Sequence, residues 1–356
     1  MKDNVIVKLD NVSKKFNDSY VIKDVSLDIY EGEFITLLGP SGCGKTTILR
    51  MISGLERVSS GKVFIDNKDV TDTDPTKREV NTIFQNFALF SKMTVYENVA
   101  FGLRMQKRPD DEIKSRVSKV IKLVKLEGYE DRYPAELSGG QQQRVAIARG
   151  IIMNPKVLLL DESLCSLDLK LKKSMQIELK RIQKKLGITF IYVTHAQDEA
   201  LSMSDRVAII NKGVIEQLGT PSEIYMDPKT VFVANFIGEA NIVEGEIKKQ
   251  KDDIIDVSIL DGTVISIKTN DTFKKGEIVK VIIRPEDVKI SVNKLTDSIT
   301  GVITDYIYGG ENTKLILDLY DGKYSLKTSV TDEEKYETGD TVYIKFEEKY
   351  IVALRK

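Results

Sequence analysis

An eight-residue glycine-rich run constrains the fold of this chain more than any other feature. Residues 39–46 read Gly-Pro-Ser-Gly-Cys-Gly-Lys-Thr, which matches the phosphate-loop pattern G-x-x-x-x-G-K-[ST]. Its glycines let backbone N–H groups turn inward around an anion, Lys45 can reach the outer phosphates, and the Thr46 hydroxyl can ligate Mg²⁺. Apolar residues 34–38 predict a strand before the loop, and apolar residues at helical spacing predict a helix after it that ends at Gly54. This order predicts a nucleotide site in an α/β fold.

The overall composition limits the class of protein. A chain of 356 residues predicts about two domains, and 53 Lys and Arg against 54 Asp and Glu leave a net charge of -1. This balance argues against a dedicated nucleic-acid surface, which usually carries a basic excess. No apolar run reaches the roughly 18 residues of a membrane span, and the first residues lack the apolar core of a signal peptide. With only two cysteines, we expect a protein of the reducing cytosol that contacts a membrane only through a partner.

Two further apolar runs predict strands that end in residues suited to catalysis: 157–160 before Asp161-Glu162, and 188–193 before Thr194-His195. Continuous apolar strands indicate a parallel sheet that is covered on both faces. The carboxyl ends of such strands meet at one edge, where ligands bind in open α/β sheets. An apolar stripe at helical spacing between the two runs, closed by Gly187, predicts a β-α-β crossover.

The middle and the C-terminal third of the chain differ in pattern. Residues from about 86 to 155 are predicted to be mainly helical, with a capping box at Thr94–Glu97. After about residue 240, strand-like runs alternate with the hairpin signals Asp261-Gly262 and Asp321-Gly322. These runs are 254–260, 263–268, 277–283, 314–319 and 341–346. We predict small all-β, OB-like barrels here, with a generic β-sandwich as the alternative.

A second motif, Leu137-Ser-Gly-Gly-Gln-Gln-Gln-Arg144, follows the phosphate loop along the chain. Here the chain resembles the ATP-binding cassette (ABC) ATPases, whose signature is LSGGQ, and the resemblance covers about the first 235 residues. It implies a P-loop ABC domain over residues 1–237: a RecA-like core with an antiparallel β subdomain and a helical subdomain at about 86–155. A C-terminal regulatory β-barrel of OB-like (TOBE) type is then expected over residues 238–356.

In this family the phosphate loop and the signature lie on opposite faces of a subunit, so two subunits meet head to tail and bury two ATP molecules. The residues themselves support a second phosphate contact, because Ser138-Gly-Gly opens a helix while the chain has only one phosphate loop. The resemblance implies that Ser138 and Gly140 contact the γ-phosphate of the partner's ATP, with Gly139 and Gln141 in the same signature. It also implies that Asp168, at the end of the D-loop, lines the partner's site.

The resemblance also implies roles within one subunit. It assigns adenine stacking to Phe16, contact with Mg²⁺ and the attacking water to Gln85, Mg²⁺ binding through water to Asp161, the general base to Glu162, and γ-phosphate binding to His195. The other ATP-binding residues are Gly39, Pro40, Ser41, Gly42, Cys43, Gly44, Lys45, Thr46 and Thr47, with Thr46 also a Mg²⁺ ligand. A core position is the alternative for Phe16, and a structural or surface role is the alternative for His195.

Three positions depart from the family pattern. Ser163 follows the expected general base where Pro is usual, Cys165-Ser166 opens the D-loop where Ser-Ala is usual, and Lys172 stands where Arg is common. These changes leave the phosphate, metal and base positions intact. We expect any effect to fall on communication between subunits.

An apolar cluster follows Gln85 at the start of the expected helical region: Phe87, Leu89, Phe90, Met93 and Tyr96. In transport ATPases this region docks a short helix of the membrane subunit. We therefore expect the cluster to be partly exposed, with ordinary subdomain core as the alternative.

One ATPase domain followed by small β-barrels resembles the ATPase subunits of importers for sugars, sulfate, iron and polyamines. Arg284-Pro-Glu-Asp287 is typical of the appended domain, and residues 236–242 look most like ATPase subunits of spermidine/putrescine importers. The resemblance implies a polyamine-transporting ATPase that uses ATP and Mg²⁺ at the cytoplasmic face of the cell membrane. Its expected partners are a second copy, two integral-membrane permease subunits and, through the complex, an extracytoplasmic solute-binding protein, with no nucleic acid.

Other classes fit the sequence less well. The same role in an importer of another solute is the first alternative. A soluble ABC ATPase of DNA repair or translation would carry long coiled-coil insertions or two cassettes, and this chain has neither. A P-loop kinase would leave the signature unexplained, and a regulator that only binds nucleotide would lack a general base.

Overall fold

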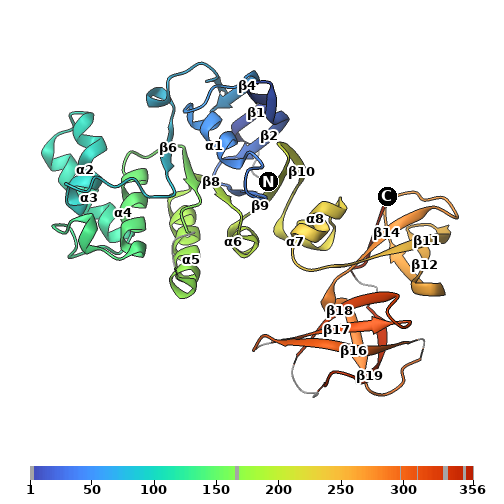
Figure 1. The fold of residues 1–356 in the computed structure, drawn as a ribbon. Coiled ribbons are helices and arrows are strands. Elements are labelled where there is room, and N and C mark those ends of the chain that lie inside the picture. Colours follow the sequence, from blue (N-terminus) through green and yellow to red (C-terminus); the bar gives the residue numbers. More distant parts are fainter. Residues whose placement is uncertain are drawn as a thin grey trace. The chain divides into compact units, whose positions relative to one another are not determined.

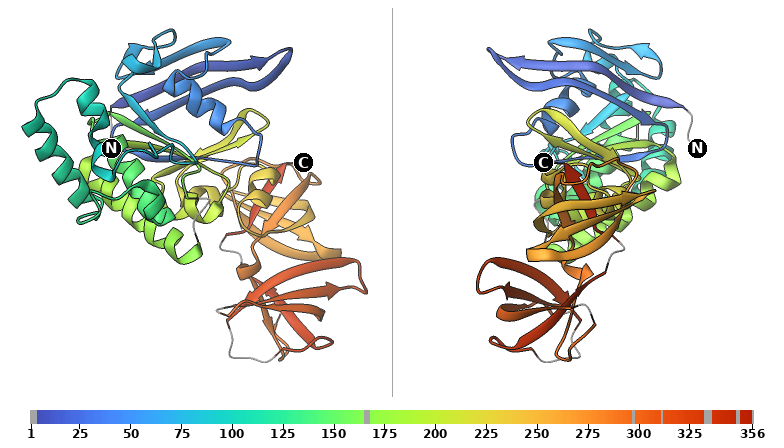
Figure 2. Two further views of the ribbon diagram at one scale, coloured as in Figure 1. Left: turned by 60° about the vertical axis from the view of Figure 1, so that its left-hand side comes forward. Right: turned by 90° about the vertical axis from the view of Figure 1, so that its right-hand side faces the viewer.

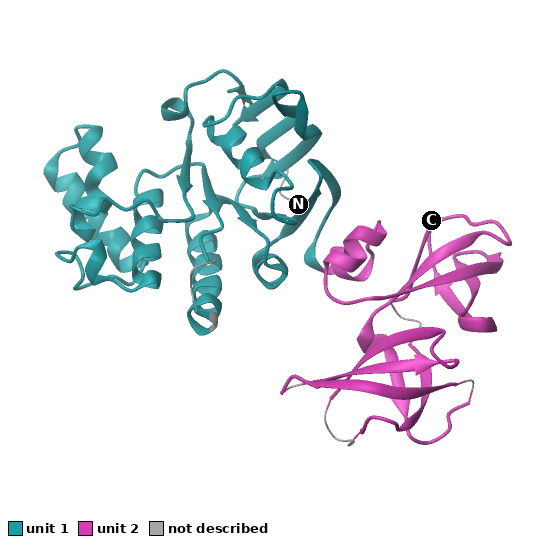
Figure 3. Ribbon diagram, viewed as in Figure 1, with its two compact units in different colours: residues 1–221 teal, residues 222–356 magenta. Residues whose placement is uncertain are grey.

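The structure is a computed structural model that describes residues 4–164, 168–296, 298–310, 312–331, 336–347 and 350–355. It divides into two compact units, residues 1–221 and 222–356 (Figure 3). The domain boundary that we predict after residue 237 falls within the second unit, and it stays a prediction. Cys165 and Ser166 lie outside the described residues, so the D-loop departure at these positions has no structural account.

A six-stranded, mainly parallel sheet forms the centre of unit 1 (Figure 1). Its order is β10-β9-β3-β8-β7-β6, and each neighbouring pair is parallel except β10 with β9. The strands are β3 (Phe34–Leu38), β6 (Val80–Ile83), β7 (Val157–Asp161), β8 (Thr189–Thr194), β9 (Arg206–Asn211) and β10 (Val214–Gly219). The three predicted strands β3, β7 and β8 are buried neighbours, so their carboxyl ends meet at one edge, as predicted.

An antiparallel sheet shares an apolar core with this central sheet. Its order is β2-β1-β4-β5, and the strands are β1 (Val5–Phe16), β2 (Ser19–Tyr30), β4 (Ser60–Ile65) and β5 (Lys68–Asp69). Helix α1 (Lys45–Ser53) belongs to the same core, where Ile48 and Ile52 are buried among residues of both sheets. The helix ends at Gly54 in a left-handed conformation, which confirms the predicted stop.

Three helices gather at one end of unit 1 (Figure 2): α2 (Val95–Met105), α3 (Asp110–Leu123) and α4 (Gly139–Ile151). A capping box at Thr94 starts α2, and another at Ser138 starts α4, so both predicted helix starts are confirmed. Helix α5 (Leu169–Leu186) is the predicted crossover between β7 and β8, and it ends at Gly187. It buries Met175 and Leu179 in the core that α2, α3 and α4 share. Helix α6 (Gln197–Met203) follows β8.

Two short helices, α7 (Pro221–Met226) and α8 (Val231–Phe236), precede an all-antiparallel β region. Its sheets have the orders β13-β12-β11-β14-β20 and β15-β19-β16-β17-β18 around one apolar core. The strands are β11 (Asn241–Lys251), β12 (Ile254–Ile259), β13 (Thr263–Lys268), β14 (Ile278–Ile283), β15 (Val288–Ser291), β16 (Ile299–Tyr308), β17 (Thr313–Leu319), β18 (Tyr324–Val330), β19 (Thr341–Phe346) and β20 (Val352–Arg355). Asp261 and Asp321 are left-handed in the connections β12–β13 and β17–β18, which confirms the predicted hairpins.

Candidate nucleotide site

The phosphate loop joins β3 to α1, and two of its glycines stand where a side chain has no room. A Cβ on Gly39 would collide with the carbonyl oxygen of Ile210, and a Cβ on Gly44 would collide with Ile22. Gly44 also has a φ of 104°, which glycine adopts without strain. The loop is therefore a tight backbone turn at a helix N-terminus, which fits an anionic phosphate group.

Lys45 places a positive charge inside this turn. Its side chain is 4 % exposed, and the ammonium group donates to the carbonyl oxygens of Gly39 and Pro40, both at 2.7 Å. A buried cation at the start of a helix strengthens the attraction for phosphate oxygens. Of the other loop residues, Ser41 and Gly42 are exposed, Thr47 is half-buried and Cys43 is buried.

Thr46 and Asp161 bring two oxygen ligands together beside the loop. The Thr46 hydroxyl donates to Asp161 Oδ1 at 3.0 Å, across from α1 to the end of β7. Burial raises the pKa of the Asp161 carboxyl, the hydrogen bond from Thr46 opposes this rise, and the charge of Glu162 adds to it. A hydroxyl and a carboxylate are the ligands that Mg²⁺ takes alongside substrate phosphates, so the residues present fit this ion.

Glu162 lies between Gln85 and His195. Gln85 Nε2 donates to Glu162 Oε2, and His195 Nδ1 lies beside Glu162 Oε1, both at 3.3 Å. The Glu162 N–H donates to the carbonyl oxygen of Val193 in β8 at 3.0 Å, and its φ of 45° is left-handed, which is uncommon for glutamate. The structure thus brings three predicted residues together from the ends of three strands, with Gln85 and His195 on the two oxygens of the Glu162 carboxylate.

Phe16 and His195 are both open to solvent, at 45 % and 50 % exposure. The core alternative for Phe16 is therefore wrong. The Lys14 ammonium lies 4.9 Å from the Phe16 ring centroid, a cation–π distance, and Ile22 of the same β1–β2 hairpin abuts Gly44. The same hairpin thus carries an exposed aromatic ring and a residue that contacts the phosphate loop, which is consistent with an adenine contact.

The signature residues lie at the start of α4. Ser138 accepts from the Gln141 N–H at 3.4 Å, and the Gln141 side chain accepts from the Ser138 N–H at 2.9 Å. Ser138 and Gly139 are exposed, whereas Gly140 is buried, and a Cβ there would lie 2.9 Å from Leu171 of α5. Asp168 is exposed and caps α5 by accepting from the Leu171 N–H at 2.9 Å. Within one chain, these residues present a capped, solvent-facing helix N-terminus.

The apolar cluster after Gln85 is only partly as expected. Leu89, Phe90, Met93 and Tyr96 are half-buried, which confirms the partial exposure that we predict for them. Phe87 is 6 % exposed and belongs to the core of the helical region, so its predicted exposure is wrong. Its φ of 60° is left-handed, so the backbone changes direction at Phe87 in a way that apolar spacing does not reveal.

A buried network behind His195 is absent from the sequence-based prediction. Glu199 of α6 is fully buried, accepts from the Thr194 hydroxyl at 2.5 Å and lies 2.8 Å from the Lys172 ammonium. Tyr192 also donates to Glu199. The departure at Lys172 thus contributes an ion pair that ties α5 to the segment carrying His195. In the sequence, the only sign of this ion pair is that Lys172 stands where Arg is common in the family.

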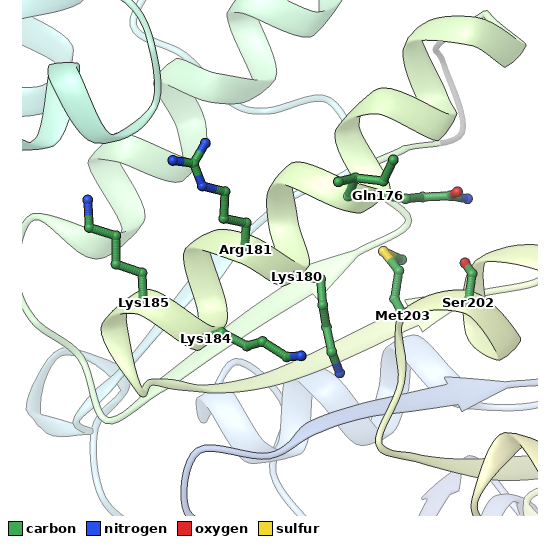
Figure 4. Close-up of a pocket in the computed structure, with 8 residues that line it drawn as sticks. Gln176, Lys180, Arg181, Lys184, Lys185, Ser202 and Met203 are labelled. Atoms are coloured by element: carbon green, nitrogen blue, oxygen red, sulfur yellow. The ribbon is translucent and has the colours of Figure 1, made fainter.

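Two cavities lie in unit 1 near these elements. One, of about 780 Å³, is lined by Arg50, residues 84–88, Gln142 and Asp161, so it reaches from the candidate metal ligand to α4. Another, of about 650 Å³, lies along α5 and α6 (Figure 4), where Lys180, Arg181, Lys184 and Lys185 make it basic. The second cavity includes none of the predicted site residues.

Comparison with known proteins decides the family. A family model described as ABC transporter matches residues 22–164, and one described as TOBE domain matches residues 281–354. A spermidine/putrescine import ATP-binding protein PotA of Nitratidesulfovibrio vulgaris is 46 % identical over 99 % of this chain and 98 % of its own length. The chain belongs to the ABC transporter ATP-binding family. A PotA of Oleidesulfovibrio alaskensis is 50 % identical to this ABC protein, over 89 % of the chain and 86 % of the relative.

Solved structures confirm the ABC ATPase fold. CbiO1 of Clostridium perfringens, part of the ABC transporter complex cbiONQ, superposes with a TM-score of 0.59 at 34 % identity, over 62 % of this chain and 91 % of its own. A dimeric ATP-binding cassette in a post-hydrolysis state, bound to ADP and Pi, superposes with a TM-score of 0.55 at 36 % identity. The match covers 61 % of this chain and 99 % of that cassette. The TOBE match over residues 281–354 and the antiparallel sheets around it confirm the predicted OB-like TOBE domain in the C-terminal part of the chain. Among the described helices of this ABC protein, none is long and apolar enough to cross a bilayer.

Proposed function

We propose that this chain is the ATP-hydrolysing, energy-coupling subunit of a polyamine importer. The observation that carries the proposal is the Glu162 carboxylate, which contacts Gln85 on one oxygen and His195 on the other. It stands at the same sheet edge as the Thr46–Asp161 pair, next to the phosphate loop. The printed names of the relatives, which specify spermidine/putrescine import, support the cargo.

Lys45 and the loop residues 39–47 bind the β- and γ-phosphates, and Phe16 stacks on adenine. Thr46 and Gln85, with Asp161 through water, would hold Mg²⁺, which would supply charge neutralisation on these phosphates. Phosphoryl transfer to water requires positioning and charge stabilisation more than covalent chemistry. The chain therefore contributes a fixed cradle, one buried ammonium group and an aromatic platform to nucleotide binding.

Glu162 acts as the general base. It accepts a proton from the water whose oxygen attacks the γ-phosphorus, and the bond from that phosphorus to the ADP oxygen breaks. Gln85 and His195 hold one carboxylate oxygen each and so fix the direction of the base. Because His195 Nδ1 faces Glu162, Nε2 is the nitrogen directed to the γ-phosphate.

Two copies close around two ATP molecules, and each copy completes the other's site. Ser138 and Gly140 contact the partner's γ-phosphate, Gly139 and Gln141 belong to the same signature, and Asp168 lines the partner's site. The exposed, capped start of α4 supports this arrangement, since a helix N-terminus attracts phosphate. The dimeric form of a solved relative supports it as well. Hydrolysis removes the γ-phosphate from between the copies, so ATP closes the dimer and its cleavage reopens it.

The closing motion drives two permease subunits at the cytoplasmic face of the membrane. An extracytoplasmic solute-binding protein delivers the polyamine to the permease subunits. The half-buried residues Leu89, Phe90, Met93 and Tyr96 dock a permease helix, because they leave apolar surface at the end of unit 1. Residues 238–356 form the appended regulatory domain, after an ATPase domain over residues 1–237.

Solute uptake tests this function. A bacterial strain without polyamine import that carries this chain with its own permease and solute-binding subunits should accumulate labelled spermidine or putrescine. In the Glu162→Gln control, ATP binding should persist while ATP turnover falls by roughly 10² to 10⁴, the worth of a general base, and uptake should stop. Uptake of a labelled sugar or sulfate instead would assign another cargo. ATP turnover without uptake of any of these solutes would refute the importer role.

A further inference from the structure

The segment that carries Gln85 has an unusual backbone. Phe87 and Ala88 follow Gln85 closely and have φ values of 60° and 45°. Two consecutive left-handed residues other than glycine persist only where the surrounding structure holds them. The direction in which Gln85 leaves this segment, toward Glu162, therefore depends on whatever fixes the backbone at Phe87 and Ala88.

One side chain contacts both of these residues. Arg149 lies near the end of α4, and its guanidinium donates to the carbonyl oxygen of Ala88 at 2.7 Å and to that of Phe87 at 2.9 Å. The same group lies 5.1 Å from the centroid of the Phe90 ring. Because the guanidinium is planar, two donors point in fixed, parallel directions, and this geometry matches two successive carbonyl groups. Burial lowers the pKa of Arg149, as expected for a cation that is held against the protein.

The other end of the same helix carries the signature. Ser138 and Gln141 cap the start of α4, and the Gln142 side chain donates to the carbonyl oxygens of Pro134 and Leu137 at 3.0 and 3.3 Å. Helix α4 is a continuous element of 13 residues, so a displacement at its start is carried to its end. The start of α4 therefore carries the signature, which serves the partner's ATP in the proposed dimer. Its end is tied through Arg149 to the Gln85 segment, which serves the copy's own ATP.

We propose that Arg149 is a positioning residue that couples the signature helix to Gln85. When a partner's ATP engages Ser138, α4 moves, and Arg149 carries the carbonyls of Phe87 and Ala88 with it. Gln85 then reaches its working position against Glu162 in its own site. Each site thereby responds to nucleotide in the other, without a contact between Arg149 and nucleotide. This inference rests on the proposed ATPase function.

A second residue in this region defines the purely structural alternative. Asn98 of α2 is fully buried and donates to the carbonyl oxygens of Phe90, Met93 and Thr94 at 3.0–3.1 Å. Asn98 therefore holds residues 90–94, which lie further along the chain from Gln85 than Phe87 and Ala88 do. If Arg149 only stabilised the helical region, as Asn98 does, its loss would lower stability and would act independently of Gln85.

The test is a double-mutant cycle on ATP turnover by the purified full-length chain. Arg149→Met removes both donors and keeps a similar length, and Arg149→Lys keeps a charge with a different geometry. Arg116→Met is the matched control, since Arg116 donates to the carbonyl oxygen of Ile152 beyond the end of α4, at 2.5 Å, and not to residues 84–88. Each variant is measured for kcat, ATP dissociation constant and melting temperature, with and without Gln85→Ala.

We expect Arg149→Met to lower kcat roughly tenfold, with little change in ATP affinity, because two charge-assisted hydrogen bonds are lost away from the nucleotide. Arg149→Lys should recover part of this loss, and Arg116→Met should keep wild-type kcat. In the Gln85→Ala background, Arg149→Met should cause no further loss, since it acts through Gln85.

Three outcomes would overturn the coupling role: multiplicative losses in the double variant, a loss of kcat that Arg116→Met reproduces, or failure of both Arg149 variants to fold. The last result would assign Arg149 to the core of the helical region. Failure of the proposed ATPase activity itself is distinguishable, because the wild-type chain would then not hydrolyse ATP at all.

Discussion

The Thr46 hydroxyl donates to Asp161 Oδ1 at 3.0 Å and so joins the first turn of α1 to the last residue of β7. The two residues are separated by 115 positions in sequence, yet they place two oxygen ligands side by side. Burial raises the pKa of Asp161, which means that the ionised carboxylate lowers the stability of the folded chain when no cation is bound. A bound cation would offset this loss of stability.

This pKa shift has a definite sign for stability. A carboxyl whose pKa is raised by folding contributes most at low pH, and its contribution is lost as the pH rises through the folded pKa. At pH 7, Asp161→Asn should therefore raise the melting temperature of the nucleotide-free protein, while Mg²⁺-dependent ATP turnover is lost. Thermal unfolding at pH 7 measures this effect, and the gain should shrink as the pH falls toward the ordinary pKa range of a free carboxyl group. A variant less stable than wild type at pH 7 would contradict the burial argument.

Phe16 should contribute to ATP affinity and not to stability, because its ring is 45 % exposed. Stacking of a base on an aromatic side chain is worth about 1–3 kcal/mol, so Phe16→Ala should weaken ATP binding by roughly 5- to 150-fold. Phe16→Tyr keeps the flat ring and serves as the control. Titration calorimetry in the Glu162→Gln background measures both variants without turnover. Unchanged affinity in Phe16→Ala would remove Phe16 from the site.

Phe87 and Met93 should behave differently, although both belong to the apolar cluster after Gln85. Phe87 is buried, so Phe87→Ala should lower the free energy of unfolding by about 3–5 kcal/mol, as a truncated core aromatic does. Met93 is half-buried, and Met93→Ser should cost roughly 1 kcal/mol while it weakens assembly with the permease subunits. Denaturant unfolding and co-purification from detergent measure the two effects. Wild-type assembly of Met93→Ser would argue against docking at this surface.

The sequence was most informative where short-range patterns decide structure. The strand at residues 34–38, the stop at Gly54 and the capping box at Thr94 all lie where predicted, because each depends on neighbouring residues. The same holds for the ends of β7 and β8, whose apolar runs placed Asp161, Glu162 and His195 at one edge of the sheet.

Contacts between distant segments could not be predicted in this way. Arg149 is 61 and 62 residues away from its two carbonyl partners, and neither carbonyl has a signature in the sequence. Glu199 reads as a surface residue of a short helix, but three side chains converge on it in the interior. Strand β11 was not predicted either, because its last residues, Lys248–Lys251, are polar.

Asp287 gives unit 2 a predicted pH dependence. Burial, with the nearby charges of Glu286 and Glu347, raises the pKa of Asp287 to about 6, against the smaller opposing effects of Lys289 and Arg284. The stabilising contribution of the protonated carboxyl is complete below about pH 4 and is lost as the pH rises through about 6. Asp287→Asn should therefore stabilise the chain by roughly 1–3 kcal/mol at pH 7 and by much less at pH 4. Calorimetric unfolding at both values checks this, and an equal effect at both would contradict it.

The composite site between two copies is the central claim, and mixing two inactive variants tests it most directly. Lys45→Ala disables a copy's own phosphate loop, and Ser138→Arg disables the signature that it offers to its partner. In a mixed dimer one site would then combine an intact loop with an intact signature. Equal mixing should therefore raise ATP turnover clearly above that of either variant, up to at most roughly a quarter of the wild-type rate, because half of the dimers would have one working site of two. Mixtures no more active than the separate variants, with Ser138→Arg alone hydrolysing ATP at the wild-type rate as a monomer, would contradict the account.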